Sequence, residues 1–120
     1  MEVVRTFLGQ QILLSCEKIG NDLNVLCCGG EQKHIGAVSV ARPEMVGDVM
    51  RVSISTIAGD GHKEDDLSRM IARRFCKASG TTVAVVCGIH YDGIGPDEIA
   101  EIGTIINEMT EELIGREFLA

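Results

Sequence analysis

The sequence predicts an α+β fold, a mainly antiparallel sheet of about six strands with two long helices packed on one face. Alternation of apolar and polar side chains dominates before Gly59, and helical spacing of three and four residues dominates after Gly61. One apolar segment lies between the two helical patterns, so the chain must cross back to the sheet once. Residues 1–120 contain neither a linker nor an internal repeat, and we therefore expect a single domain.

The first half of the chain is predicted to form five strands, because short alternating segments are separated by turn-forming residues. These strands are expected at 3–8, 11–19, 23–28, 34–41 and 50–55. Residues 43–48 are expected to connect the fourth strand to the fifth. Ser39, Ser53 and Ser55 are most simply explained as residues of the solvent face.

Two helices are predicted in the second half, on either side of a short strand. The apolar stripe of the first helix consists of Leu67, Met70, Ile71, Phe75 and Ala78. Gly80 is placed to end this helix. Residues 81–87 form an apolar, β-branched run that is typical of a central strand. Pro96 opens the last helix as its first residue. The apolar positions of that helix are Ile99, Ile102, Ile106, Met109 and Leu113.

The stripe of the last helix has two interpretations. It is either the core face that covers the sheet or the seam of an interhelical contact. We expect a homo-oligomer that forms through this helix or through the solvent face of the sheet. Ile105 and Ile114 lie outside the stripe and are therefore expected to report a dimer contact.

Composition narrows the classes of function. A net charge of −7 argues against nucleic acid, whose binding depends on neutralising phosphates. No segment reaches the roughly 18 apolar residues of a membrane span, and the first residues do not resemble a signal peptide, so we expect a cytoplasmic protein. The five cysteines include no CxxC pair, which favours small buried thiols in a reducing compartment.

The most informative segment is 57–66, which joins the fifth strand to the first helix through two glycines. It places His62, Lys63 and Glu64 in one turn, followed by two aspartates. A helix N-terminus presents unpaired N–H groups that can hold an anion. Acidic residues in a first turn also stabilise the helix dipole without any further role. Both interpretations remain open.

The three histidines are expected to meet at one edge of the sheet. If the fourth and fifth strands pair antiparallel, His34 lies beside His62, and the crossover brings His90 to the same edge. Asp92, Glu64 and Asp65 are then near. Such a group suits a transition metal, or, with the adjacent lysine and helix start, the phosphate of a nucleotide or flavin. The alternatives are a protein-docking edge and histidines that merely bond to loop carbonyls.

No sequence pattern demands catalysis. The serines do not lie in a G-x-S-x-G elbow, and the glycines follow neither G-x-G-x-x-G nor the phosphate-loop spacing. Enzyme activity is therefore not the first expectation, and no catalytic residue is assigned.

Three motifs resemble one family. They are His-Ile-Gly-Ala-Val at 34–38, Gly-His-Lys-Glu-Asp at 61–65 and Gly-Ile-His-Tyr-Asp at 88–92. The chain resembles the prenylated-flavin chaperone-like family, which includes the small D subunit associated with gallate and related hydroxyarene decarboxylases. The resemblance runs from about residue 34 to residue 101 and more loosely over the preceding strands. Tyr91 is a departure, because an apolar residue is expected before the aspartate.

The resemblance implies a fold similar to the proteasome assembly chaperones. It also implies a role in maturing a flavin-dependent decarboxylase, whose subunits would be the partner, through prenylated FMN or FMN. The residues that it implies for cofactor binding are His34, Gly61, His62, Lys63, Glu64, His90 and Asp92. The alternatives are a ligand-free assembly factor and a small protein or enzyme that binds a metal or a phosphate ligand.

Overall fold

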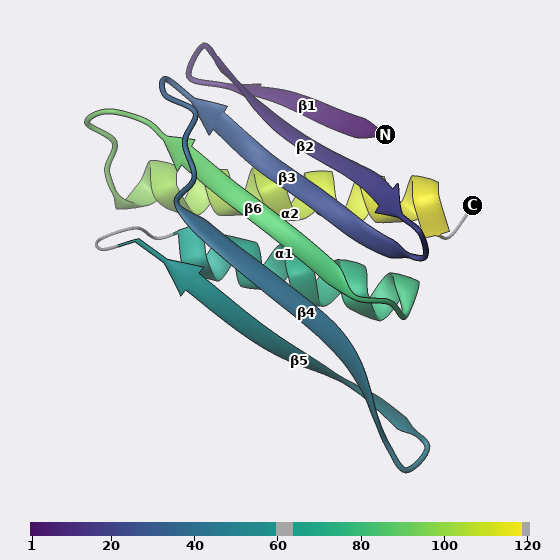
Figure 1. Ribbon diagram of the computed structural model, residues 1–120. Helices are drawn as coiled ribbons and strands as arrows, with labels where there is room; N and C mark the ends of the chain where they lie inside the picture. Colours follow the sequence, from purple (N-terminus) through teal and green to yellow (C-terminus); the bar gives the residue numbers. More distant parts are fainter. Residues whose placement is uncertain (60–63, 119–120) are drawn as a thin grey trace.

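The computed structural model describes residues 1–59 and 64–118 of the 120-residue chain, and this part forms one sheet and two helices (Figure 1). Along the chain the elements are β1 (Glu2–Phe7), β2 (Gln10–Ile19), β3 (Asp22–Gly30), β4 (Ala37–Val46), β5 (Val49–Ala58), α1 (Glu64–Ser79), β6 (Val83–His90) and α2 (Pro96–Phe118). The predicted order of five strands, a helix, a strand and a helix is confirmed.

The sheet has the strand order β1-β2-β3-β6-β4-β5. Every neighbouring pair is antiparallel except β3 and β6, which run parallel. Both helices lie on the same face of the sheet, and the other face is left open (Figure 1). The predicted architecture is therefore confirmed. The helix α1 carries the chain back along the sheet before β6 begins. The strand β6 then lies in the middle of the sheet, between β3 and β4, and not at its edge.

The predicted fourth strand is shifted by the structure. It was expected at 34–41 with a connection at 43–48, but β4 runs from Ala37 to Val46 and turns at Gly47 into β5. Pro43 lies inside this strand opposite Val52. A proline is tolerated there because β6 pairs with β4 only as far as Ala41, so the proline removes no ladder hydrogen bond.

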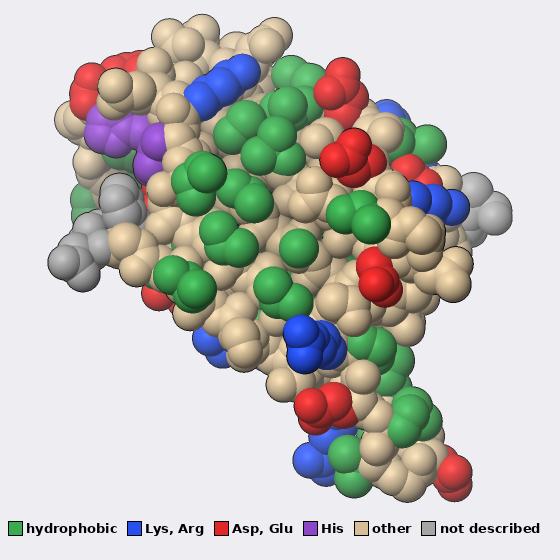
Figure 2. All heavy atoms as spheres, in the orientation of Figure 1, with side chains coloured by type: hydrophobic (Ala, Val, Ile, Leu, Met, Phe, Trp, Pro, Cys, Tyr) green, Lys and Arg blue, Asp and Glu red, His purple; other side chains and the backbone are tan. Residues whose placement is uncertain are grey.

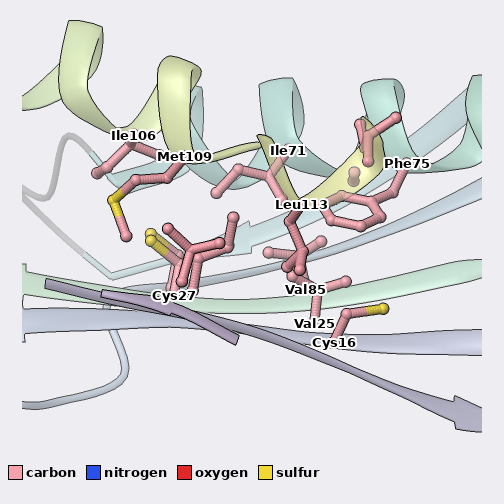
Figure 3. Packing of buried hydrophobic residues seen from close by; sticks show 14 of the residues in the cluster. Cys16, Val25, Cys27, Ile71, Phe75, Val85, Ile106, Met109 and Leu113 are labelled. Carbon is pink, nitrogen blue, oxygen red and sulfur yellow. The ribbon is translucent and has the colours of Figure 1, made fainter. Parts of the chain in front are cut away.

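The core lies between the helices and the sheet (Figure 3). Ile71 and Phe75 of α1 and Met109 of α2 are fully buried against Val25 and Val85 of the sheet. Burial of each such side chain contributes about 1.5–3 kcal/mol to the stability of the folded protein. The helical stripes and the alternate residues of the central strands converge on this core, and most of these residues are aliphatic.

The stripe of α2 is a core face. Ile102, Ile106 and Leu113 are buried in the protein's own core. Ile114 is also only 7% exposed, so the expectation that it would report a dimer contact is wrong. The helical pattern alone could not separate Ile114 from a surface position, because α2 buries a face wider than its stripe.

Ser39 corrects a second expectation, since it is fully buried and does not lie on the solvent face. Its hydroxyl is hydrogen-bonded to the hydroxyls of Ser68 on α1, at 2.7 Å, and Thr56 on β5, at 2.8 Å. Strand alternation places Ser39 on the helix side together with Ala37 and Ala41. A small polar residue is accommodated there because both of its partners are polar.

The five cysteines are free and buried, as predicted. Cys27 lies beside Cys87 in the parallel pair β3–β6. The hydrogen bond that the Cys27 thiol donates to Cys87, and then burial, raise the pKa of Cys27 well above its ordinary value. These thiols act as small core side chains. Neither of the described helices is long and apolar enough to cross a membrane.

Candidate functional site

Two of the three histidines meet at the end of the sheet where β6 stops. The ring centroids of His34 and His90 are 6.3 Å apart, and the rings are nearly perpendicular at 80°. Their predicted convergence is therefore confirmed. His34 lies in the connection before β4 and does not begin that strand, whereas His90 is the last residue of β6. Gly61, His62 and Lys63 were also expected in the site and lie outside the described residues.

Two glycines let the chain bring the histidines together. The connection that carries His34 crosses β6 directly over Gly88, where a Cβ atom would overlap the carbonyl oxygen of His34. Gly36 then donates its N–H to the carbonyl of Cys87, at 2.9 Å. A Cβ on Gly36 would lie 2.7 Å from the carboxyl carbon of Glu64. Only glycine allows both close approaches.

Glu64 connects the first helix to His34. It is the first residue of α1 and is 6% exposed, and its Oε1 lies 3.2 Å from Nε2 of His34. Nδ1 of the same ring lies 3.3 Å from the carbonyl oxygen of Gln32. Both ring nitrogens of His34 lie close to an oxygen atom. Glu64 is thus more than a dipole-stabilising residue, because it orients a histidine.

His90 has a carboxylate partner of its own. Its Nε2 lies 2.7 Å from Oδ1 of Asp92. Glu31 completes this group: its backbone N–H donates to the carbonyl of His90 at 2.8 Å, and its side chain hydrogen-bonds to Asp92. The shared hydrogen bond raises the pKa of Glu31, and bonds from Glu31 and His90 lower the pKa of Asp92. Sequence patterns do not indicate Glu31, which belongs to none of the three motifs.

An apolar pocket of about 470 Å³ lies beside this group, between the start of α1 and the connection from β6 to α2. Glu64, Asp66 and His90 contribute its polar groups. Its apolar lining consists of Leu67, Ile89, Ile94, Ile99 and Ile102. Leu67, Ile99 and Ile102 were predicted from the sequence only as members of the apolar helical stripes. A pocket cannot be recognised in such residues, because periodicity does not distinguish a packed contact from an open one.

A second hollow of about 450 Å³ adjoins His90 from the other direction. It is lined by Gln32, Lys33, His34 and His90. His90 lines both spaces, so the histidine pair stands between an apolar pocket and a hollow with one lysine.

Tyr91 fixes the connection that follows His90. Its hydroxyl donates to the carbonyls of Phe7, at 2.9 Å, and Gln10, at 3.3 Å, and its ring packs edge-on against Phe7 with centroids 5.5 Å apart. The residue that departs from the family pattern therefore ties the site to the β1–β2 hairpin. The Tyr91 side chain is buried, and its hydroxyl is hydrogen-bonded to these two carbonyls, so tyrosine can occupy a position where an apolar residue is expected.

Metal binding finds no support among the residues that the structure describes. No group of three or more His, Cys, Asp or Glu side chains in that part of the chain could hold a metal ion.

Comparison with known proteins agrees with the fold and the motifs. Residues 6–117 match the family model described as the prenylated flavin chaperone LpdD-like domain. Protein LpdD of Lactiplantibacillus plantarum is 26% identical over 106 residues, which cover 88% of this chain and 76% of that protein. A chain in the crystal structure of a novel chaperone complex for yeast 20S proteasome assembly superposes with a TM-score of 0.52. That likeness has 15% identity, covers 94% of both chains, and concerns the fold alone. With nearly the whole chain matched, this protein belongs to the prenylated flavin chaperone LpdD-like family.

Proposed function

We propose that this protein is a chaperone-type accessory factor that holds a prenylated flavin during the maturation of a hydroxyarene decarboxylase. One observation carries the proposal: His90, which is paired with Asp92 and lies beside His34, lines an apolar pocket in a chain of this family. A pocket of this size is within the range of sites that bind small molecules.

The two spaces beside His90 suit two different parts of a flavin nucleotide. The apolar pocket suits fused aromatic rings and a prenyl-derived group, because its lining is mostly isoleucine and leucine. Glu64 and Asp66 at its rim would repel a phosphate. The second hollow contains Lys33 and is the better place for that anion. We therefore place the ring system against the pocket and the phosphate toward Lys33.

The histidines would hold and protonate polar atoms of the ring. His34 and His90 each have one nitrogen close to a carboxylate, which fixes the ring orientation of the imidazole. A prenylated flavin supplies the decarboxylation chemistry in its partner enzyme. The accessory protein itself needs only to bind, orient and release it.

Binding is tested by absorbance titration and native mass spectrometry with FMN and with prenylated FMN. We expect one flavin per chain, and His90→Ala should weaken binding by at least about tenfold, the effect of a lost interaction of about 1.4 kcal/mol. Arg73→Ala is the control, because Arg73 is exposed on α1 and lines neither space. If neither flavin binds, or if His90→Ala binds like the unaltered protein, the ligand proposal fails.

The cellular role needs a separate measurement. Deleting this protein should lower the prenylated flavin content of the decarboxylase purified from the same cells, and His90→Ala should fail to restore it. An alternative is an assembly factor that binds no ligand. That alternative is favoured if deletion reduces assembly of the decarboxylase while the purified accessory protein binds no flavin.

A further inference from the structure

The sheet face opposite the helices is apolar and is left uncovered by them, and the connection from β3 to β4 crosses it over Gly88 at the end where β6 stops. Figure 2 shows hydrophobic side chains gathered across this face. Val4 is 40% exposed, Leu26 37% and Ile57 79%. They are joined by the half-buried side chains of Val38, Val40 and Val86. Strand register places Leu26, Val86, Val38 and Ile57 side by side in one row across four strands. A contiguous apolar patch of this kind marks an interaction surface.

Strand register places several charged residues on the open face, Glu2, Glu44 and Arg51 among them, and two that flank the central strand pair indicate what covers it. Glu17 is on β2 and Arg42 is on β4, and both are exposed. Glu17 accepts a hydrogen bond from Asn24, its neighbour on β3, at 3.2 Å. The strands β2 and β4 are the outer neighbours of the central pair β3 and β6. The two charges of opposite sign thus flank the middle of the sheet on opposite sides.

The register gives these charges nearly the same level along the strands. Glu17 lies in the row that continues through Asn24, Ala84 and Val40, and Arg42 is the next residue of β4 on the same face. A twofold axis that runs along the strands between β3 and β6 would therefore bring Glu17 of one copy close to Arg42 of another, and the reverse. A self-complementary surface of this kind is what a twofold dimer requires.

We propose that the open face binds a second copy of this chain, sheet against sheet, about an axis along the β3–β6 pair. With about 4.8 Å between strands and about 3.3 Å per residue, six strands of eight residues present roughly 650 Å² of flat area. The accessible area of such a surface is larger than its flat projection. It therefore approaches the roughly 800 Å² per partner of a standard stable interface.

This arrangement joins the two histidine sites. His90 ends β6 opposite Gly30, which ends β3, so both residues border the proposed axis. Rotation about an axis along the strands leaves this end of the sheet at the same end of the dimer. Packed sheets are about 10 Å apart, so the second copy's His90 would lie across the interface, close to the first site. Each site is then built from residues of both copies.

The mass in solution, measured by sedimentation velocity and light scattering, tests the interface. We expect twice the 12.9 kDa mass of the chain. Leu26→Glu should give a monomer, because it places a charge in the apolar row on β3, next to the proposed axis. Circular dichroism shows whether this variant remains folded. A monomeric wild-type protein at high concentration, or a folded Leu26→Glu variant that still dimerises, would overturn the proposal.

A charge-reversal pair tests the direction of the axis. Glu17→Arg alone and Arg42→Glu alone should each weaken dimerisation at least about tenfold, because like charges then face each other. The double variant should recover most of the loss. Arg73→Glu, on α1 away from this face, should change nothing. A double variant no better than either single variant contradicts the axis, and dissociation by Ile105→Glu would place the interface on α2 instead.

Discussion

At the scale of single residues, buried and shared polar groups carry much of the specificity of this fold. Ser39 is hydrogen-bonded to hydroxyls on a helix and on a neighbouring strand, and it links three elements through one oxygen. Glu31 and Asp92 share a hydrogen bond beside His90. Each arrangement makes a prediction that a substitution can check.

Replacing Ser39 with alanine should destabilise the protein by about 1–3 kcal/mol, because the hydroxyls of Thr56 and Ser68 lose a partner in a dry environment. Urea denaturation measures the change in the free energy of unfolding. Ser53→Ala is the matched control, since Ser53 is exposed on β5 and its loss should cost almost nothing. Equal stability of the two variants would contradict the role assigned to Ser39.

The pKa of Glu31 should fall toward its ordinary value in Asp92→Asn, because the bond to Asp92 is the largest cause of its rise. The sign for stability follows from that direction. A carboxyl whose folded pKa is raised stabilises the fold at pH values below that pKa, and the contribution is lost as pH rises through it. An NMR titration of the side-chain carboxyl carbons measures the pKa of Glu31 in the unaltered protein and in the variant, with Glu17 as a distant reference. A pKa of Glu31 that does not change would exclude the shared bond.

At the scale of elements, the connection between β3 and β4 determines the site. It carries Glu31 and His34, crosses β6 over Gly88, and is bonded to β6 at both ends of the crossing. Alternation predicted the existence and order of the strands well, since each has one face on the core. It predicted the bounds of β4 poorly, because a proline usually ends a strand. Pro43 is compatible with β4 only because the pairing of β4 with β6 has already ended at Ala41, which the sequence does not reveal.

Gly88→Ala should displace this connection, because the added methyl overlaps the carbonyl of His34. We expect a loss of about 1–3 kcal/mol in stability, as for other overpacked positions, and a longer distance between His34 and Glu64. Gly103→Ala is the control, since a Cβ on this residue of α2 meets no atom within 4 Å. That variant should gain up to about 1 kcal/mol from helix propensity. Thermal unfolding and a crystal structure of each variant measure both effects.

At the scale of the whole molecule, the sequence could predict that strand ends bring histidines together, but it could not predict what surrounds them. Strand direction brings His34 and His90 to the same end of the sheet, and the close approach at Gly88 then allows their contact. The participation of Glu31 depends on how a loop folds, and the pocket depends on how the segment around Ile89 and Ile94 lies relative to the start of α1. Neither the conformation of a loop nor the presence of a pocket produces a periodic pattern of residues in the sequence.

The cysteines provide a measure of opening of the whole molecule. All five are buried, so iodoacetamide should label native protein only through unfolding. Labelling of Cys27 should accelerate with urea in parallel with the global transition. Ile19→Cys is the positive control, because residue 19 is 63% exposed and should react at once. Rapid labelling of Cys27 without urea would show that the centre of the sheet opens locally.

The insertion of β6 between β3 and β4 has a consequence for synthesis. Residues 1–59 contain five of the six strands, yet β3 and β4 do not pair with each other, and each awaits a neighbour that comes after α1. A chain emerging from the ribosome therefore displays two unpaired strand edges until residues 83–90 have been made. Such edges readily pair with other chains. This member of a chaperone family thus passes through an aggregation-prone stage of its own, which ends only when β6 joins the two halves of the sheet.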